Sequence, residues 1–228
     1  MTPKDPGEQK EPYDLDHQCK SSSGHLLMSR VDRGFTGRSR STTDPSRVPP
    51  GQYLTRDFPV LSAGPTPHTS LHEWSFTIRG AVDEPASWTW EEFIALPAET
   101  ITVDIHCVTK WSKLDTDWRG VPVDTLLDAV DTEAEYLTAW SDGGYTTNLA
   151  VEDVTGGRAW VAYEYDGEPL EAEHGGPARL LVPGQYFWKS AKWVRGLALT
   201  SDDEPGFWEM YGYHNHGDPW LEQRYQGD

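Results

Sequence analysis

Cysteine is scarce in this 228-residue chain, which has only Cys19 and Cys107. Disulfide scaffolds belong mainly to cysteine-rich secreted chains, and Cys19 lies in a polar stretch near the N-terminus. No C-x-x-C pair is present, so a zinc site built from paired thiolates is not indicated either. We therefore expect two free thiols in a reducing compartment.

Basic residues and long apolar runs are also few. The chain has 19 Lys and Arg against 37 Asp and Glu, a net charge of -18. Such a surface repels phosphate, which excludes nucleic acid and anionic lipid as expected partners. No apolar run approaches the roughly 18 residues that suggest a membrane span. The first 30 residues contain no apolar stretch after a basic start and no adjacent arginines, so we expect a cytoplasmic protein without membrane insertion.

The first 49 residues differ in composition from the rest. They are rich in Ser, Thr, Pro, Gly and charged residues and have no periodic apolar face, so they cannot bury enough surface to offset the entropy of ordering. From "PPGQYLTRDFPVL" onward the apolar and aromatic content rises. The expected organisation is a flexible or partly docked tail over residues 1–49 and one folded domain over residues 50–228.

Short periodic segments separated by Gly and Pro predict many strands and few helices. Strict apolar alternation predicts strands over residues 73–80 and 101–107. Two short helices are predicted, one over residues 87–97 with Ser87 as N-cap and one over residues 123–130 with Asp124 as cap. Further strands are predicted at 135–141, 144–150, 158–167, 178–184 and 193–200. The pattern lacks regular βαβ alternation and indicates an α+β, mainly β, domain.

Cys107 stands where a predicted buried strand ends, in "ITVDIHCVTKW". A thiolate is a soft metal ligand and a strong nucleophile, whereas a thiol can also serve as a small packing group. His106 is its neighbour and would lie on the opposite face of the strand, which makes a Cys/His pair awkward. A lone cysteine remains able to be the single protein ligand of a metal whose other ligands come from a cofactor.

A basic segment stands out from the acidic background at residues 173–196, "EHGGPARLLVPGQYFWKSAKWVRG". Lys189, Lys192 and Arg195 lie within seven residues of one another, and Arg179 lies ten residues before the first. Glycines let a backbone approach a ligand, and these bases could hold a phosphate or another anion. The alternative is a solvated face that offsets nearby acids. The spacing of a P-loop is absent.

The third group of polar residues is "YGYHNHGDPW", which contains His214, His216 and Asp218. Imidazole and carboxylate are common metal ligands. The Gly-Asp-Pro sequence that follows His216 indicates a turn, so we interpret these histidines as structural or surface residues.

Two of these segments, "HCVTKWSKLDTDWRGVPVDTLL" and "HGGPARLLVPGQYFWKSAKWV", together with the tail "GFWEMYGYHNHGDPWLEQRY", resemble the molybdopterin-binding domain of the sulfite oxidase family. The similarity covers about residues 34–226. It is greatest to the short bacterial and archaeal sulfite oxidase-like oxidoreductases, which are related to the catalytic subunit of methionine sulfoxide reductase. The resemblance implies that family's fold and a molybdopterin cofactor with one molybdenum.

The resemblance also implies roles for individual residues. Cys107 matches the cysteine that ligates molybdenum, and it would therefore be both the metal ligand and the catalytic residue. His174 and Arg179 match residues that contact the pterin. The remaining cofactor-binding matches are Phe187, Trp188, Lys189, Ser190 and Lys192. The substrate-binding arginines of true sulfite oxidases have no clear counterpart, and Arg56 and Lys110 are the candidates for facing an anionic substrate.

The function implied is molybdenum-dependent oxygen-atom transfer on a small sulfur or nitrogen oxide substrate, sulfite oxidase-like or sulfoxide reductase-like. The chain has no haem domain, so a separate electron carrier protein is implied. Two alternatives remain open at the level of sequence: a non-catalytic anion-binding module that keeps the fold without the metal, and an enzyme that uses Cys107 as a nucleophile.

Overall fold

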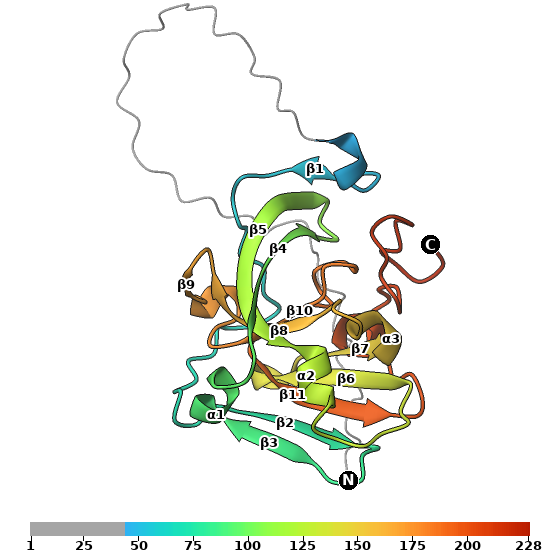
Figure 1. Ribbon diagram of the computed structural model, residues 1–228. Helices are drawn as coiled ribbons and strands as arrows, with labels where there is room; N and C mark the ends of the chain where they lie inside the picture. Colours follow the sequence, from blue (N-terminus) through green and yellow to red (C-terminus); the bar gives the residue numbers. More distant parts are fainter. Residues whose placement is uncertain (1–43) are drawn as a thin grey trace, which may run out of the picture. The chain divides into compact units, whose positions relative to one another are not determined.

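The computed structural model describes residues 44–228, and the structure is that of a mainly β domain with short helices (Figure 1). Residues 1–43, which include Cys19 and most of the predicted tail, lie outside the described residues. The helices are α1 Trp90–Ile94, α2 Val123–Leu127, α3 Val151–Val154 and α4 Phe207–Met210, with 3-10 turns η1 Pro45–Arg47, η2 Asp142–Gly144 and η3 Ala172–His174. None of the helices described has the length and apolar character that crossing a membrane requires.

The strands form two sheets. The six-stranded sheet has the order β1-β5-β8-β10, with β4 beside β5 and β9 beside β8; the five-stranded sheet has the order β3-β2-β11-β6-β7. The strands of the first are β1 Tyr53–Leu54, β4 Glu99–His106, β5 Trp111–Pro122, β8 Trp160–Tyr165, β9 Glu168–Pro169 and β10 Arg179–Leu181. Those of the second are β2 Ser75–Gly80, β3 Ala86–Thr89, β6 Tyr136–Ser141, β7 Thr146–Ala150 and β11 Val194–Thr200. The α+β, mainly β, prediction is therefore confirmed.

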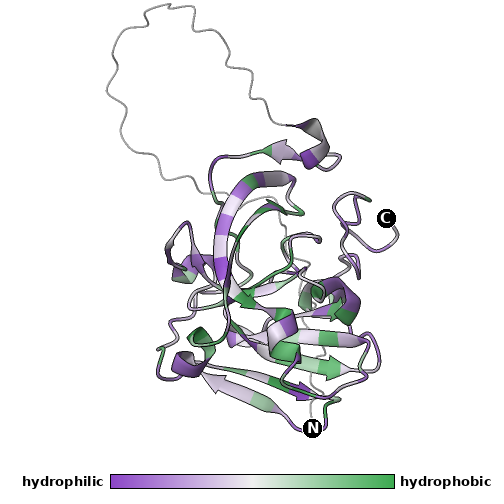
Figure 2. Ribbon diagram, viewed as in Figure 1, coloured by the Kyte–Doolittle hydropathy of each residue, from purple (hydrophilic) through white to green (hydrophobic). Residues whose placement is uncertain are grey.

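Alternating apolar residues in the strands build a core shared by both sheets. Phe76 and Ile78 on β2 and Trp74 just before it are buried as their spacing predicts, and they pack with residues from β6, β8 and β11. The strongest hydrophobic colour in Figure 2 likewise falls on these strands and on α2. A second, smaller cluster surrounds Cys107 with Ile105, Trp111 and Trp118. The end of β4 is thus buried in a cluster that is separate from the main core.

The first predicted helix is shorter than expected and has another cap. Ser87 lies in β3, where it pairs with Thr77, so the prediction of Ser87 as N-cap is wrong. Thr89 takes that role, because its hydroxyl accepts from the N–H of Glu92 while the Glu92 carboxylate accepts from the N–H of Thr89. This reciprocal arrangement satisfies two N–H groups that have no partner within the helix.

The second predicted helix is also displaced at its start. The N-cap of α2 is Pro122, and Asp124, predicted as the cap, lies in the first turn. The Asp124 carboxylate accepts instead from the N–H groups of Gly156 and Gly157, 2.8 and 2.9 Å away. It therefore fixes the loop after α3 rather than its own helix.

Ordered contacts begin before residue 50. The Arg47 guanidinium donates to Asp104 on β4 and to Asp115 on β5, each at 2.6 Å. Pro49 is buried. Residues 44–49, placed in the tail by composition, are therefore attached to the β4–β5 hairpin, and Cys107 lies in the turn that joins these two strands.

Candidate active site

Cys107 lies in a tight turn between β4 and β5. Its N–H donates to the Trp111 carbonyl at 2.8 Å, and its carbonyl accepts from Lys110 at 3.0 Å, which requires a positive φ of 74° at Lys110. The thiol is 7% exposed, and the Thr109 hydroxyl donates to its sulfur at 3.1 Å. Burial raises the pKa of the Cys107 thiol, and the Thr109 hydrogen bond acts in the opposite direction. The thiol is therefore shielded, and Cys107 packs in the cluster with Ile105, Trp111 and Trp118, called the Cys107 cluster.

Arg179, on β10, is the second feature of the site. Its side chain is 1% exposed, and it donates to the carbonyls of His174 and Ser190 at 2.8 and 2.6 Å. The guanidinium lies over the Phe187 ring, 4.0 Å from its centroid. No ion pair found among residues 44–228 includes Arg179, and burial lowers its pKa to about 9. A buried cation without a carboxylate is costly, so the site is suited to an anion that is not part of the described chain.

Two further side chains approach this cation. The Lys192 ammonium donates to the carbonyls of Leu61 and Glu173 at 2.8 and 2.6 Å, and burial followed by the charge of Arg179 lowers its pKa to about 7. His174 has a buried Nδ1 without a hydrogen-bond partner in the structure, and burial together with Lys192 and Arg179 lowers its pKa to about 4. An unpartnered ring nitrogen beside two bases is suited to contact a polar ligand.

Phe58 is a residue of the site that the sequence did not indicate. Its ring stacks on His174 at a centroid distance of 3.9 Å and also approaches Trp111, Trp118 and Phe187 at 6.0 to 6.4 Å. Phe58 thus joins the Cys107 cluster to the Arg179 segment. No periodic pattern surrounds it in "TRDFPVL", so only a contact across the fold could identify it.

Lys189, predicted as a cofactor-binding residue, forms an ion pair within the protein. The side chain is fully buried, and its ammonium lies 2.6 Å from the Glu209 carboxylate of α4. It also donates to the backbone carbonyl and the side-chain oxygen of Asn148. Burial lowers the Lys189 pKa, and the Glu209 charge opposes this shift. The ammonium is therefore paired inside the protein, and contact of Lys189 with a cofactor stays a prediction.

The other predicted residues divide into two sets. Phe187 lies against Arg179, and the Ser190 carbonyl holds that guanidinium while its hydroxyl accepts from Val182 at 2.9 Å. Trp188 points elsewhere, because its ring N–H donates to Glu209. Arg56 and Lys110 are both exposed, and the structure shows no contact of either side chain with Arg179.

The histidines near the C-terminus are structural, as the sequence predicted. His216 pairs with Asp153 at 3.1 Å, and the Nδ1 of His214 accepts from the N–H groups of His216 and Gly217. In the described part of the chain, no group of three or more His, Cys, Asp or Glu side chains is arranged to hold a metal ion. A metal at Cys107 would therefore need most of its ligands from a non-protein group.

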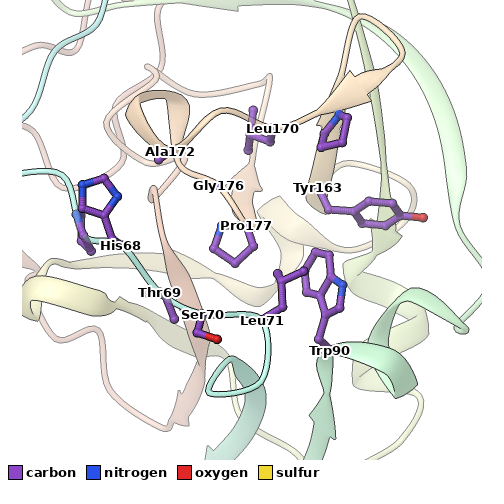
Figure 3. Close-up of a pocket in the computed structure, with 12 residues that line it drawn as sticks. His68, Thr69, Ser70, Leu71, Trp90, Tyr163, Leu170, Ala172, Gly176 and Pro177 are labelled. Carbon is purple, nitrogen blue, oxygen red and sulfur yellow. The ribbon is translucent and has the colours of Figure 1, made fainter.

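A cavity of about 450 Å³ lies beside the segment 170–177 and is walled mainly by Trp90, Tyr163, Leu170 and Pro177 (Figure 3). Neither Cys107 nor Arg179 lines it. Its walls are apolar, with the polar side chains of His68, Thr69 and Ser70 at one end. This cavity is not the anion site, which consists of buried groups packed against one another.

Comparison with known proteins identifies the family of this chain. The model of the family described as "oxidoreductase molybdopterin binding domain" matches residues 63–208. The chain belongs to this molybdopterin-binding family. Its members are oxidoreductases that use a molybdenum-molybdopterin cofactor, which confirms the family, the enzyme class and the cofactor that the sequence predicted.

Relatives and a solved structure resemble the molybdopterin-binding domain described above. The oxidoreductase YuiH of Bacillus subtilis (strain 168) is 42% identical over 197 residues, which is 85% of this chain and 100% of that protein. A putative protein-methionine-sulfoxide reductase subunit, YedZ1, of Azospira oryzae is 29% identical over 86% of this chain and 76% of its own length. The sulfane dehydrogenase SoxCD from Paracoccus pantotrophus is similar in structure, with a TM-score of 0.55 and 25% identity over 60% of this chain and 41% of that one.

The residues of this molybdopterin-binding domain fit the cofactor. Cys107 offers one soft sulfur ligand, and the cofactor would supply the other ligands of the metal. The guanidinium of Arg179 and the ammonium of Lys192 offer positive charge for a phosphate, and the orphaned Nδ1 of His174 offers a polar contact for the pterin. Cys107 and Arg179 are buried, and Lys192 and His174 are half-buried, so water reaches these groups less than it would at the surface.

Replacing Arg179 by methionine is expected to lower the molybdopterin content of purified protein about 10-fold or more, because one of the buried charges that hold an anion is lost. Molybdenum analysis and pterin fluorescence after denaturation measure this content. Arg79→Met is the matched control, since Arg79 lies on β2 with its guanidinium 4.8 Å from the Trp140 ring centroid and is exposed. Equal cofactor content in the two variants would contradict the role of Arg179.

His106 makes the cofactor-free protein sensitive to acid. It is 4% exposed, its Nδ1 lies 2.8 Å from the Ser112 hydroxyl, and burial lowers its pKa to about 4. Between pH 6.5 and 4 the unfolded chain binds a proton at this site that the folded protein does not, so the free energy of unfolding falls as the pH falls. His174 contributes in the same direction.

We expect His106→Gln to reduce the slope of unfolding free energy against pH in this window by about one proton. Urea titrations between pH 4 and 6.5 measure the slope. The same substitution at the exposed His68 is the control, and an unchanged slope in His106→Gln would show that this side chain does not titrate on unfolding.

Proposed function

We propose that this protein transfers an oxygen atom between water and a small sulfur or nitrogen oxide substrate. The observation that carries the proposal is the buried Cys107 sulfur in the same packed region as a buried Arg179 that has no carboxylate partner among residues 44–228. When bound, the molybdenum cofactor supplies two-electron redox chemistry. The named relatives include a protein-methionine-sulfoxide reductase subunit and a sulfane dehydrogenase, which supports a sulfur-containing substrate.

The chain's own residues hold and shape the reaction site. Cys107 would bind the metal through its sulfur, and the Thr109 hydroxyl, which donates to that sulfur at 3.1 Å, would hold it in place and reduce its negative charge. With the cofactor bound, Arg179 and Lys192 would hold its phosphate, and His174 would contact the pterin. The aromatic side chains of Phe58, Trp111 and Trp118 exclude water from the sulfur, since all three pack in or against the Cys107 cluster.

The overall reaction balances through a separate carrier. In the oxidative direction, water supplies the oxygen atom, two protons are released and two electrons pass to an electron carrier protein. The reductive direction is the reverse, with water as a product. Lys110 and Arg56 are exposed bases in and near the Cys107 turn and are our candidates for attracting an anionic substrate.

A substrate screen tests this function. Molybdenum-loaded protein is mixed with sulfite, a methionine sulfoxide, an N-oxide or nitrate, together with an artificial dye as electron donor or acceptor. We expect turnover with at least one of them. Fully loaded protein that is inactive with all four in both directions would contradict the proposal, and protein that takes up no cofactor would favour an anion-binding module.

A cytoplasmic location is part of the proposal. A free, reduced Cys107 thiol is needed before the metal binds, and a reducing compartment supplies it. Cell fractionation of the native host, with antibody detection, tests the location. Recovery of the protein outside the cytoplasmic fraction would overturn it.

A further inference from the structure

The exposed large apolar side chains are not spread evenly over the surface. Seven of the eleven found among residues 44–228 lie in two segments, residues 53–54 and 210–225. Soluble proteins rarely gather such residues without a binding function. Four of the seven flank the Cys107 turn and are called the rim residues: Tyr53, Leu54, Trp220 and Leu221.

Tyr53 and Leu54 lie on one side of the turn. They form β1, which pairs with Trp111 and Ser112 immediately after the turn. The preceding residue, Gln52, donates its side-chain N–H to the Cys107 carbonyl at 3.1 Å. The exposed rings and methyls of β1 are therefore fixed to the turn that carries the sulfur.

Trp220 and Leu221 lie on the other side. The Trp220 ring is 45% exposed and packs edge-on against His106, with 6.0 Å between ring centroids. Leu221 is 66% exposed. The two sides are joined directly, because Arg224 donates to the Pro50 carbonyl at 3.4 Å.

This arrangement offers a short path from the surface to the sulfur. His106 is bonded to Cys107 through one peptide unit, and its ring is 4% exposed under Trp220. The path therefore runs from an exposed indole through one packed contact and then through covalent bonds. A protein that touches Trp220 comes close to the metal ligand without entering the site.

The charge of the domain indicates the partner. Six of the 37 acids and seven of the 19 bases lie in residues 1–43, which leaves 31 acids and 12 bases in the described part. Asp218 and Glu222 flank Trp220 and Leu221 in sequence, whereas Lys110 and Lys113 lie near β1. The acidic excess is therefore spread over the whole surface, where it speeds the approach of a basic protein. Close contact with that protein is then made by the apolar rim residues.

We infer that the rim residues form the docking surface for a small, positively charged electron-carrier protein, which exchanges one electron at a time with the site at Cys107. The inference rests on the proposed function, since it names the surface used by the carrier. Two carrier molecules in turn complete each turnover. The contact is expected to be small and transient, as in other redox encounters.

Binding and electron exchange with a chosen carrier test the surface. The full, molybdenum-loaded protein is titrated with a basic c-type cytochrome and, as a probe of opposite charge, with an acidic ferredoxin. We expect binding of the cytochrome alone, weakening as salt rises from about 20 to about 200 mM. Trp220→Ala and Leu221→Ser are each expected to weaken binding about 10-fold and to slow electron exchange accordingly.

Ile94→Ser is the matched control. Ile94 is 42% exposed on α1, which lies at the far end of the domain from the C-terminal segment in Figure 1. Turnover with the small artificial dye should be the same in all three variants and in the parent, which separates failure of docking from failure of the proposed function.

Three results would overturn the inference while dye-linked turnover persists. The first is cytochrome binding that is unchanged in both rim variants or equally weakened by Ile94→Ser. The second is ferredoxin binding as tight as cytochrome binding. The third is a dimer, seen by sedimentation, that Leu221→Ser converts to a monomer, because the rim would then be covered by a second copy of the chain.

Discussion

Cys107→Ser is expected to lose turnover about 100-fold or more while the fold and most of the pterin are kept. A hydroxyl has nearly the size of a thiol, so the turn from Cys107 to Trp111 and its backbone hydrogen bonds can persist. The oxygen, however, is a hard ligand and stays protonated near neutral pH, whereas the metal requires a soft, anionic sulfur. Turnover, molybdenum content and pterin fluorescence are measured on the same preparation.

Thr109→Val provides the graded control for Cys107→Ser. It removes the hydroxyl that donates to the Cys107 sulfur but keeps the sulfur itself. We expect a smaller loss of turnover and a shift in the visible absorption of the sulfur–molybdenum bond. Full turnover in Cys107→Ser would exclude Cys107 as the essential metal ligand, and rapid alkylation of the loaded parent would indicate a free nucleophile instead.

Lys189→Met is expected to lower the free energy of unfolding by about 3–5 kcal/mol. The substitution leaves the Glu209 carboxylate buried, 1% exposed, without its cation. Glu209 would keep only the neutral donors Thr147 and Trp188. Denaturant unfolding of the cofactor-free protein measures the change, and the midpoint of thermal unfolding should fall by roughly 6–20 °C.

A double-mutant cycle separates this role from cofactor binding. Lys189→Met with Glu209→Gln should cost less than the sum of the two single changes, because no charge is then left alone. Lys113→Met is the control, since its ammonium donates to the Arg56 carbonyl at the surface. Unchanged stability in Lys189→Met combined with loss of cofactor would restore the role that the sequence predicted.

The strands could be predicted largely because their signal is local. Alternation of Trp74, Phe76 and Ile78 indicates β2 within a few residues, and the same holds for β6 and β11. β5 was not predicted, although it is the longest strand of those described. Its buried Thr116 and Trp118 alternate with charged residues, and a strand whose outer face is strongly polar resembles a loop in composition.

The N-cap of α1 also depends on strand pairing that the sequence does not show. Ser87 and Thr89 both carry a hydroxyl before the same apolar run, so the sequence does not distinguish them. Antiparallel pairing of Ser75 with Thr89 and of Thr77 with Ser87 extends β3 as far as Thr89. The helix therefore begins two residues later than predicted.

The sequence by itself determined the chemical groups of the site, namely one cysteine at a strand end and a basic segment about 70 residues later in an acidic chain. Only the tertiary structure decided which of those groups already have a partner within the protein. Lys189 pairs with Glu209, Phe58 stacks on His174, and Trp220 covers His106. Each of these contacts joins residues that are 20 to more than 100 positions apart in the sequence. Burial in the folded chain then determines whether a charged group is solvated by water, paired with an opposite charge or able to bind a cofactor.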